Sequence, residues 1–362
     1  MYIRLKWLGA WVGFSVAIAS VSGCGSGVGN NTILPTPAIT NPFASTVTQS
    51  SVPPLTAGSS TVTNTPVSYK TGTPLLATYT ATNSDRSSMG VGFLLESPAL
   101  DAAAQAHAQY LAAQTPQIES HNETQGAPSF YAITPYARAM KAGFSPSTAW
   151  IDESIGDASN CAGQLMDTVY HLQELTSNAQ QVGIGSVPGW ACVIDVATVT
   201  GSANLVQPTN GAGVPTTGGQ QLPAGVLGVY PYNGQSSVPD AMSLSEQPAP
   251  PLPSGYTNPG HPVLMRAGVV LSTDQLTVTS FTMVDSTKKV VTGVLLLDTV
   301  AAANSVSISS ATVTLVADAN IMQGVAVFVP QSALVSGMTY AVTFKGTMGA
   351  ASLSNTWAFT AQ

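Results

Sequence analysis

The sequence predicts an α+β domain followed by an all-β module, because two kinds of local pattern divide the chain. Residues 73–203 carry helix-start signals followed by strand-like runs, whereas residues 225–362 carry strand-like runs separated by turn residues. Two stretches poor in charge and rich in small polar residues, Gly and Pro predict a tether over residues 24–72 and a linker over residues 204–224. At 362 residues, the chain is long enough for two domains.

Residues 1–23 have the features of a bacterial lipoprotein signal peptide. Arg4 and Lys6 form a basic region, residues 7–21 form an apolar core that is short for a membrane span, and small residues precede Cys24. This order resembles a lipobox, which implies cleavage before Cys24 and a lipid on its sulfur. An ordinary signal peptide that contains a cysteine is the alternative.

A lipid on Cys24 implies that the membrane is a partner of this chain. Each buried CH₂ of an acyl chain contributes about 0.8 kcal/mol, so several chains on one residue hold a protein firmly at a membrane. Gly25, rather than Asp, follows the cysteine, which resembles sorting to the outer membrane. The expected location is therefore the bacterial cell envelope, on either the periplasmic or the surface face.

The charge of the chain excludes one large class of function. The formal net charge is -7, and ten Lys and Arg residues are spread thinly along 362 positions. A nucleic-acid-binding protein needs a basic face, which this composition does not supply. Because charged residues make up only 7% of the chain, a cluster of imidazoles and carboxylates within a short stretch is informative.

Three helices and two strands are expected in the α+β domain. Ser97-Pro98 and Thr134-Pro135 each place a capping hydroxyl before a proline at the first helical position, and Ser159-Asn160 can cap a third helix. Residues 181–187 and 191–200 alternate as strands and are joined by a Pro-Gly turn. Helices combined with an antiparallel pair predict a sandwich of helices and sheet.

The order of four motifs resembles the CAP superfamily, the secreted family of cysteine-rich secretory proteins, antigen 5 and plant pathogenesis-related class 1 proteins. The motifs are Ser120-His121-Asn122-Glu123, the run from Ile151 to Gly156, Tyr170-His171, and Val182-Gly183-Ile184-Gly185. The resemblance covers residues 75–203 and implies a CAP-type α-β-α sandwich.

The resemblance also implies a site. His121, Glu153 and His171 match the family's cleft residues, which converge and can hold a divalent cation, with zinc as the expected metal. Glu123 and Asp167 are additional candidates for the fourth position, because the family's second glutamate has no clear match. Glu153 is the candidate for activating a water. A buried hydrogen-bond network without metal, which pins the loops together, is the alternative.

The cysteine count predicts a disulfide. If Cys24 carries lipid, Cys161 and Cys192 are the two that remain, and export places them in an oxidising compartment. The bridge would tie a helix to a strand, and on a chain-entropy model it would contribute roughly 3–4 kcal/mol. A zinc site is the weaker alternative, because neither cysteine belongs to a Cys-x-x-Cys pair.

The β module is predicted from strand-like runs with turn residues between them. These runs are residues 276–282, 290–297, 311–316, 325–329, 339–344 and 355–360. The pattern Thr-Tyr-x-Val-Thr-Phe, followed by a terminal Trp-x-Phe-Thr, resembles bacterial immunoglobulin-like modules of surface proteins. That resemblance implies an immunoglobulin-like sandwich that acts as a spacer or an adhesion unit.

Three functions are compatible with these features. The favoured one is a non-catalytic envelope protein that binds a divalent cation, a small lipidic ligand or both; the others are a metal-dependent, peptidase-like hydrolase and a structural surface protein with a vestigial site. The sequence contains no Gly-x-Ser-x-Gly and no His-Glu-x-x-His motif. His107, on the apolar face of its helix, is expected to be a satisfied core histidine, and Arg138 to solvate a helix face.

Overall fold

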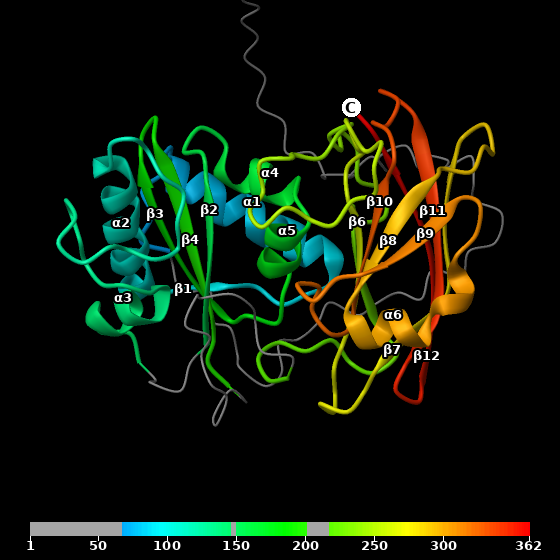
Figure 1. Cartoon of the computed structure of the whole chain (residues 1–362). Coiled ribbons are helices and arrows are strands. Elements are labelled where there is room, and N and C mark those ends of the chain that lie inside the picture. The colour runs from blue at the N-terminus through cyan, green and yellow to red at the C-terminus, as the bar shows by residue number, and fades with distance from the viewer. Residues whose placement is uncertain (1–66, 146–149, 201–216) are drawn as a thin grey trace, which may run out of the picture. The chain divides into compact units, whose positions relative to one another are not determined.

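The computed structural model describes residues 67–145, 150–200 and 217–362 (Figure 1). The predicted signal peptide, Cys24, nearly all of the tether and most of the linker lie outside these residues. Within the described part, no helix has both the length and the apolar character that a membrane span requires.

The helices of the α+β domain begin at capping hydroxyl groups. Thr73, Ser97 and Thr134 each accept a hydrogen bond from a backbone N–H in the first turn of a helix, and a proline follows each of them. The second and third of these helices were predicted from the sequence, whereas the first was not, although it begins with the same Thr-Pro pair as the third. The helices are α1 (Pro74–Met89), α2 (Pro98–Ala113), α3 (Pro135–Lys141), α4 (Cys161–Met166) and α5 (Tyr170–Leu175).

A four-stranded sheet lies between two layers of helices, as the α-β-α prediction requires (Figure 1). Its strands are β1 (Leu95–Glu96), β2 (Trp150–Gly156), β3 (Gln181–Val187) and β4 (Ala191–Thr198), in the order β1-β3-β4-β2. Helices α2 and α3 pack on one face of the sheet, and α4 and α5 contribute to the hydrophobic cluster on the other. Strand β2 was not predicted as a strand.

The two glycines of the Val-Gly-Ile-Gly motif allow α2 to lie directly on β3. A Cβ atom on Gly183 would come within 2.1 Å of the backbone of Leu100, and a Cβ on Gly185 within 2.2 Å of the backbone of Ala104. Both distances are far below van der Waals contact, so a side chain at either position would push the helix away. The motif therefore fixes the distance between helix and sheet.

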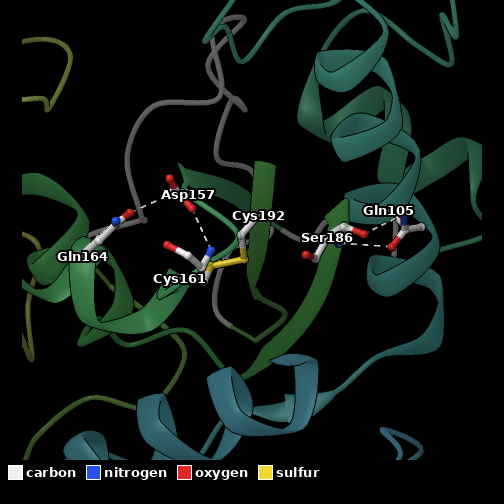
Figure 2. The surroundings of a disulfide bond; sticks show 7 residues. Gln105, Asp157, Cys161, Gln164, Ser186 and Cys192 are labelled. Atoms are coloured by element: carbon white, nitrogen blue, oxygen red, sulfur yellow. Dashed lines mark hydrogen bonds between the residues drawn. A yellow bond between two sulfur atoms is a disulfide. The ribbon is translucent and has the colours of Figure 1, made fainter. Parts of the chain in front are cut away.

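The predicted disulfide between Cys161 and Cys192 is confirmed, with a Cα–Cα distance of 5.9 Å. Figure 2 shows that it joins the first residue of α4 to β4, as expected. On the other side of the same sheet, Gln105 of α2 exchanges two hydrogen bonds with the backbone of Ser186 on β3. Helices on both faces are thus tied to the sheet by side-chain or covalent links.

The β module is a sandwich of two sheets. One sheet has the order β5-β6-β10-β8-β9 and the other has the order β12-β11-β7. All six predicted runs contain a strand, but β5, β6 and the helix α6 (Thr299–Asn304) were not predicted. The strands are β5 (Leu227–Tyr230), β6 (Val263–Ala267), β7 (Leu276–Asp285), β8 (Gly293–Leu297), β9 (Val313–Ala317), β10 (Val325–Pro330), β11 (Thr339–Met348) and β12 (Ala351–Thr360).

Aromatic side chains fill the centre of this sandwich. The ring of Phe281 on β7 stacks on Phe328 and meets Phe344 and Trp357 edge-on, with centroid distances of 5.5, 5.9 and 6.3 Å. Offset and edge-to-face pairs of this kind add to the stabilisation from burial. Because the four residues come from both sheets, they hold the two sheets together.

Candidate functional site

Five charged or titratable side chains meet on the α2/α3 face of the sheet. His107 comes from α2, His121 and Glu123 from the loop after α2, Arg138 from α3, and Glu153 from β2. We call this set the charge network. The five residues therefore come from two helices, one strand and one loop.

Glu153 is at the centre of the charge network and is fully buried. Arg138 Nη2 donates to its Oε2 at 2.5 Å, and His121 Nδ1 lies 3.1 Å from its Oε1. His107 Nε2 lies 3.6 Å from the same Oε1, within ion-pair range. Both carboxylate oxygens therefore have positively charged or hydrogen-bonding neighbours.

These neighbours determine the charge of Glu153. Burial raises the pKa of its carboxyl group, but the charges of Arg138 and His107 and the hydrogen bond from His121 outweigh burial and bring the pKa well below its usual value. The carboxylate is therefore ionised at neutral pH and is a weak base. A general base needs a pKa near the operating pH, so this environment does not suit Glu153 to that role.

Glu123 extends the network through His107. The imidazole of His107 lies 3.0 Å from Glu123 Oε1 through Nδ1 and 2.9 Å from the carbonyl of Ser120 through Nε2. Both ring nitrogens therefore face oxygen atoms. The other oxygen of Glu123 accepts hydrogen bonds from the backbone N–H groups of Tyr131 and Ala132.

Asp195 is the cross-strand partner of Glu153 and shares its face of the sheet. It is fully buried, and within the described residues no donor reaches either of its oxygens. Burial first, and then the neighbouring charge of Glu153, raises the pKa of Asp195 well above its usual value, and the protonated group can donate to Glu153. With Asp195 neutral, Glu153 faces no second negative charge from its cross-strand partner.

A second group of acids lies on the opposite face of the sheet. Successive residues of a strand point to opposite faces, so Asp152 points away from Glu153 and toward α5. There, burial and then the charge of Asp152 raise the pKa of Glu174, a fully buried residue of α5. The sheet thus separates the charge network from the acids around α5.

His171 is not part of the charge network. It lies on α5, and its Nδ1 is 3.0 Å from Glu246 Oε1, a residue of the β module. Asp167, the other candidate near it, lies 3.3 Å from His261 Nε2. The prediction that His171 converges with His121 and Glu153 is corrected here, because α5 contacts the face of β2 from which Glu153 points away.

The residues present do not fit a metal centre that needs three protein ligands. Among the described residues, no three His, Cys, Asp or Glu side chains are arranged to hold a metal ion. His121 and Glu153 are within hydrogen-bond distance of each other, but the two oxygens of Glu153 are already engaged with Arg138, His107 and His121. Glu123 joins the network through His107 and not as a ligand beside His121.

Sequence reasoning missed the central role of Arg138. The expectation that it solvates a helix face is wrong, since its side chain is 0% exposed. A signal was present, because Arg138 stands between two alanines on a helix whose other charged side chain is Lys141. The expectation for His107 is confirmed in that it is buried and has partners on both ring nitrogens.

Comparison with known proteins finds a family model that matches this part of the chain. Residues 79–196 match the family model of CAP, the cysteine-rich secretory protein family. A crystal structure of an extracellular protein containing an SCP domain, from Bacillus anthracis str. Ames, is similar to 34% of this chain and 39% of that chain, with 14% identity and a TM-score of 0.29. The similarity thus spans less than two thirds of that protein. No curated protein matches the chain.

Proposed function

We propose that this chain, whose residues 79–196 match the CAP family model, is a non-catalytic binding protein of the bacterial cell envelope. Its ligand, in this proposal, is an amphipathic molecule with an anionic head group, which binds at His121. The observation that carries the proposal is the buried ion pair between Arg138 and Glu153, with 2.5 Å between Nη2 and Oε2.

This ion pair argues against hydrolysis. A metal-dependent hydrolase would use Glu153 as the base that activates a water. Here Arg138 keeps the Glu153 carboxylate ionised and hydrogen-bonded, so that it is a weak base. Metal-assisted hydrolysis needs an ion held by about three protein ligands with a position left for water, and the residues brought together here do not fit that requirement. No observation favours the hydrolase over the binding protein.

His121 is the member of the charge network that solvent reaches. Its side chain is 36% exposed, whereas that of Glu153 is 0% exposed. Burial lowers the pKa of His121, but the hydrogen bond and charge of Glu153 outweigh burial and leave the pKa above its usual value. The ring therefore stays positively charged to a higher pH than a free histidine, as binding of an anion requires.

Ile133, an exposed apolar residue, is hydrogen-bonded through its backbone to the loop that carries His121. Ile133 is 49% exposed, and its carbonyl accepts a hydrogen bond of 2.8 Å from the backbone N–H of Glu123, two residues after His121. In this proposal, a ligand that contacts both the ring of His121 and the side chain of Ile133 is an amphipathic anion such as a fatty acid.

Binding of oleate tests this proposal. We expect the purified chain to bind oleate, and methyl oleate about tenfold more weakly or worse because the ester has no negative charge. His121→Ala is expected to weaken oleate binding about fivefold or more, whereas Lys345→Ala, which removes an exposed positive charge in the β module, should leave it unchanged. Calorimetric titration measures the affinity for each ligand and for each variant. Affinity should also fall as the pH rises through the pKa of His121.

Three outcomes would contradict the proposal. Equal affinity for oleate and its ester, or equal affinity of the wild type and His121→Ala, would show that His121 does not receive an anion. Zinc-dependent hydrolysis of casein that is lost in Glu153→Gln would favour the hydrolase instead.

The envelope location is proposed from the lipobox-like sequence before Cys24. We expect the chain to incorporate radiolabelled palmitate when it is produced in bacteria, and the Cys24→Ala variant to incorporate none and to remain uncleaved. No labelling of either chain would show an ordinary signal peptide, and equal labelling of both would show that Cys24 is not the lipidated residue.

A further inference from the structure

The five-stranded sheet of the β module has two buried faces. One face packs inside the sandwich through residues such as Met265, Leu295 and Phe328. The other face is equally apolar, and it belongs to the same hydrophobic cluster as Leu165 of α4 and Leu172 of α5 in the CAP domain. The residues on this second face are Leu264, Val294, Leu296, Val325, Val327 and Val329.

The sequence of these strands agrees with burial on both faces. A strand of a sheet with one wet face alternates apolar and polar residues, whereas a strand covered on both faces is a continuous apolar run. Strand β8 has the sequence Gly-Val-Leu-Leu-Leu and β10 the sequence Val-Ala-Val-Phe-Val-Pro, and every residue of both is buried. A free-standing spacer module would leave one of these faces in water.

Polar contacts made by Gln173 of α5 fix the CAP domain on this sheet. Its amide nitrogen donates to the carbonyl of Asn320 at 2.6 Å, and its amide oxygen accepts from the N–H of Met322 at 3.0 Å. The backbone carbonyl of Gln173 accepts from the buried guanidinium of Arg266 on β6. One residue of the CAP domain thus has three polar partners in the β module.

Glu246 makes the second set of polar contacts. Its carboxylate accepts hydrogen bonds from the backbone N–H groups of Val169, Tyr170 and His171, at 3.0, 2.8 and 2.9 Å, and pairs with the ring of His171. Helix α5 has no side-chain cap from its own Val169. A carboxylate about 75 residues further along the chain therefore satisfies the first N–H groups of this helix.

We propose that the second face of the five-stranded sheet is a permanent interface for the CAP domain, so that the β module is a structural half of one folded unit and not a separate spacer. The partner that this surface fits is the α4–α5 side of the chain's own CAP domain. The register of the interface is fixed by the polar contacts of Glu246, Gln173 and Arg266. Burial of the aliphatic side chains stabilises it.

Cutting the chain between the two halves tests this proposal. A recognition sequence for a site-specific protease, inserted between residues 208 and 209, leaves all described contacts intact. After complete cleavage, we expect the two fragments to elute together in size-exclusion chromatography and to remain associated on dilution to nanomolar concentration. Separation into two soluble, folded fragments would overturn the proposal. Separation with precipitation would support it, because it would show that a fragment needs its partner.

A variant of Glu246 measures the contribution of the polar contacts. In the cut chain, Glu246→Gln is expected to speed dissociation of the fragments about tenfold or more, because a neutral amide with one acceptor oxygen cannot replace charged bonds to four donors. Glu119→Gln, which removes an exposed carboxylate of the CAP domain, is the matched control and should leave the rate unchanged. Equal rates for both variants would show that Glu246 does not fix the interface.

Discussion

Replacing Arg138 by methionine is expected to lower the free energy of unfolding by about 3–5 kcal/mol. The substitution keeps the length and the apolar stem of the side chain but removes the guanidinium that donates to Glu153 at 2.5 Å. Glu153 is 2% exposed, so water cannot replace the lost donor. A buried carboxylate without its ion-pair partner is among the most costly defects in a folded protein.

The pH dependence of this loss follows from the charge of Glu153. Its pKa in the folded wild type lies below its usual value, so the ion pair contributes stability above the pKa of the unfolded chain, near 4.3, and loses it as the pH falls below that value. In Arg138→Met the carboxylate can take up a proton as the pH falls. The difference between variant and wild type should therefore be larger at pH 7.5 than at about pH 4.5.

Urea unfolding of a small set of variants measures both effects. Lys141→Met, which removes an exposed charge from the same helix, is the control and should change stability by less than about 0.5 kcal/mol. The double variant Arg138→Met/Glu153→Gln should recover part of the loss, because no uncompensated charge remains. If Arg138→Met behaves like Lys141→Met, the ion pair does not hold the site together, and the argument against catalysis by Glu153 loses its basis.

Local signals in the sequence predict the parts of the fold that depend on neighbouring residues. The Ser97-Pro98 and Thr134-Pro135 pairs predict α2 and α3, and the Val-Gly-Ile-Gly run predicts β3. Helix α1 was missed because its buried residues include Thr78, Thr82 and Asn83 and do not form an apolar stripe.

The position of His171 depends on contacts with residues that are distant in the sequence, and local sequence patterns do not predict such contacts. Its partner Glu246 is 75 residues away and belongs to the β module. The family resemblance assigned His171 to the same cleft as His121, and the structure brings His121, but not His171, to Glu153. Successive residues of a strand point to opposite faces of the sheet, so the histidine that can reach Glu153 is decided by the face to which Glu153 points. That face could not be predicted, because β2 had not been recognised as a strand.

The buried arginine of α1 is the second large determinant of stability. The side chain of Arg86 is 0% exposed and donates to four backbone carbonyls: that of Gly92 at 2.7 Å, those of Leu175 and Ser177 at 2.8 Å, and that of Ala179 at 3.2 Å. Leu175 is the last residue of α5, and Ser177 and Ala179 belong to the segment between α5 and β3. Arg86 thus joins α1 to the connection that leads from the helices back to the sheet.

Arg86→Met is expected to destabilise the chain by about 4 kcal/mol or more. Each buried carbonyl that loses its donor costs about 1–3 kcal/mol, and the gain from no longer burying a charge offsets only part of that sum. Arg86→Lys should lie between the wild type and Arg86→Met, because an ammonium group has three donors and cannot match the planar fork. Lys70→Met removes an exposed charge just before α1 and should be close to neutral.

Hydrogen exchange distinguishes this role of Arg86 from a general loss of packing. In Arg86→Lys, which retains the charge and much of the volume, the amides of residues 176–180 should exchange about tenfold faster than in the wild type, whereas those of the three-stranded sheet of the β module should change only with global stability. Uniform acceleration across both halves would show that Arg86 acts through the whole fold. Unchanged exchange at residues 176–180 would mean that other contacts hold this connection, and the assigned role of the four carbonyl bonds would be wrong.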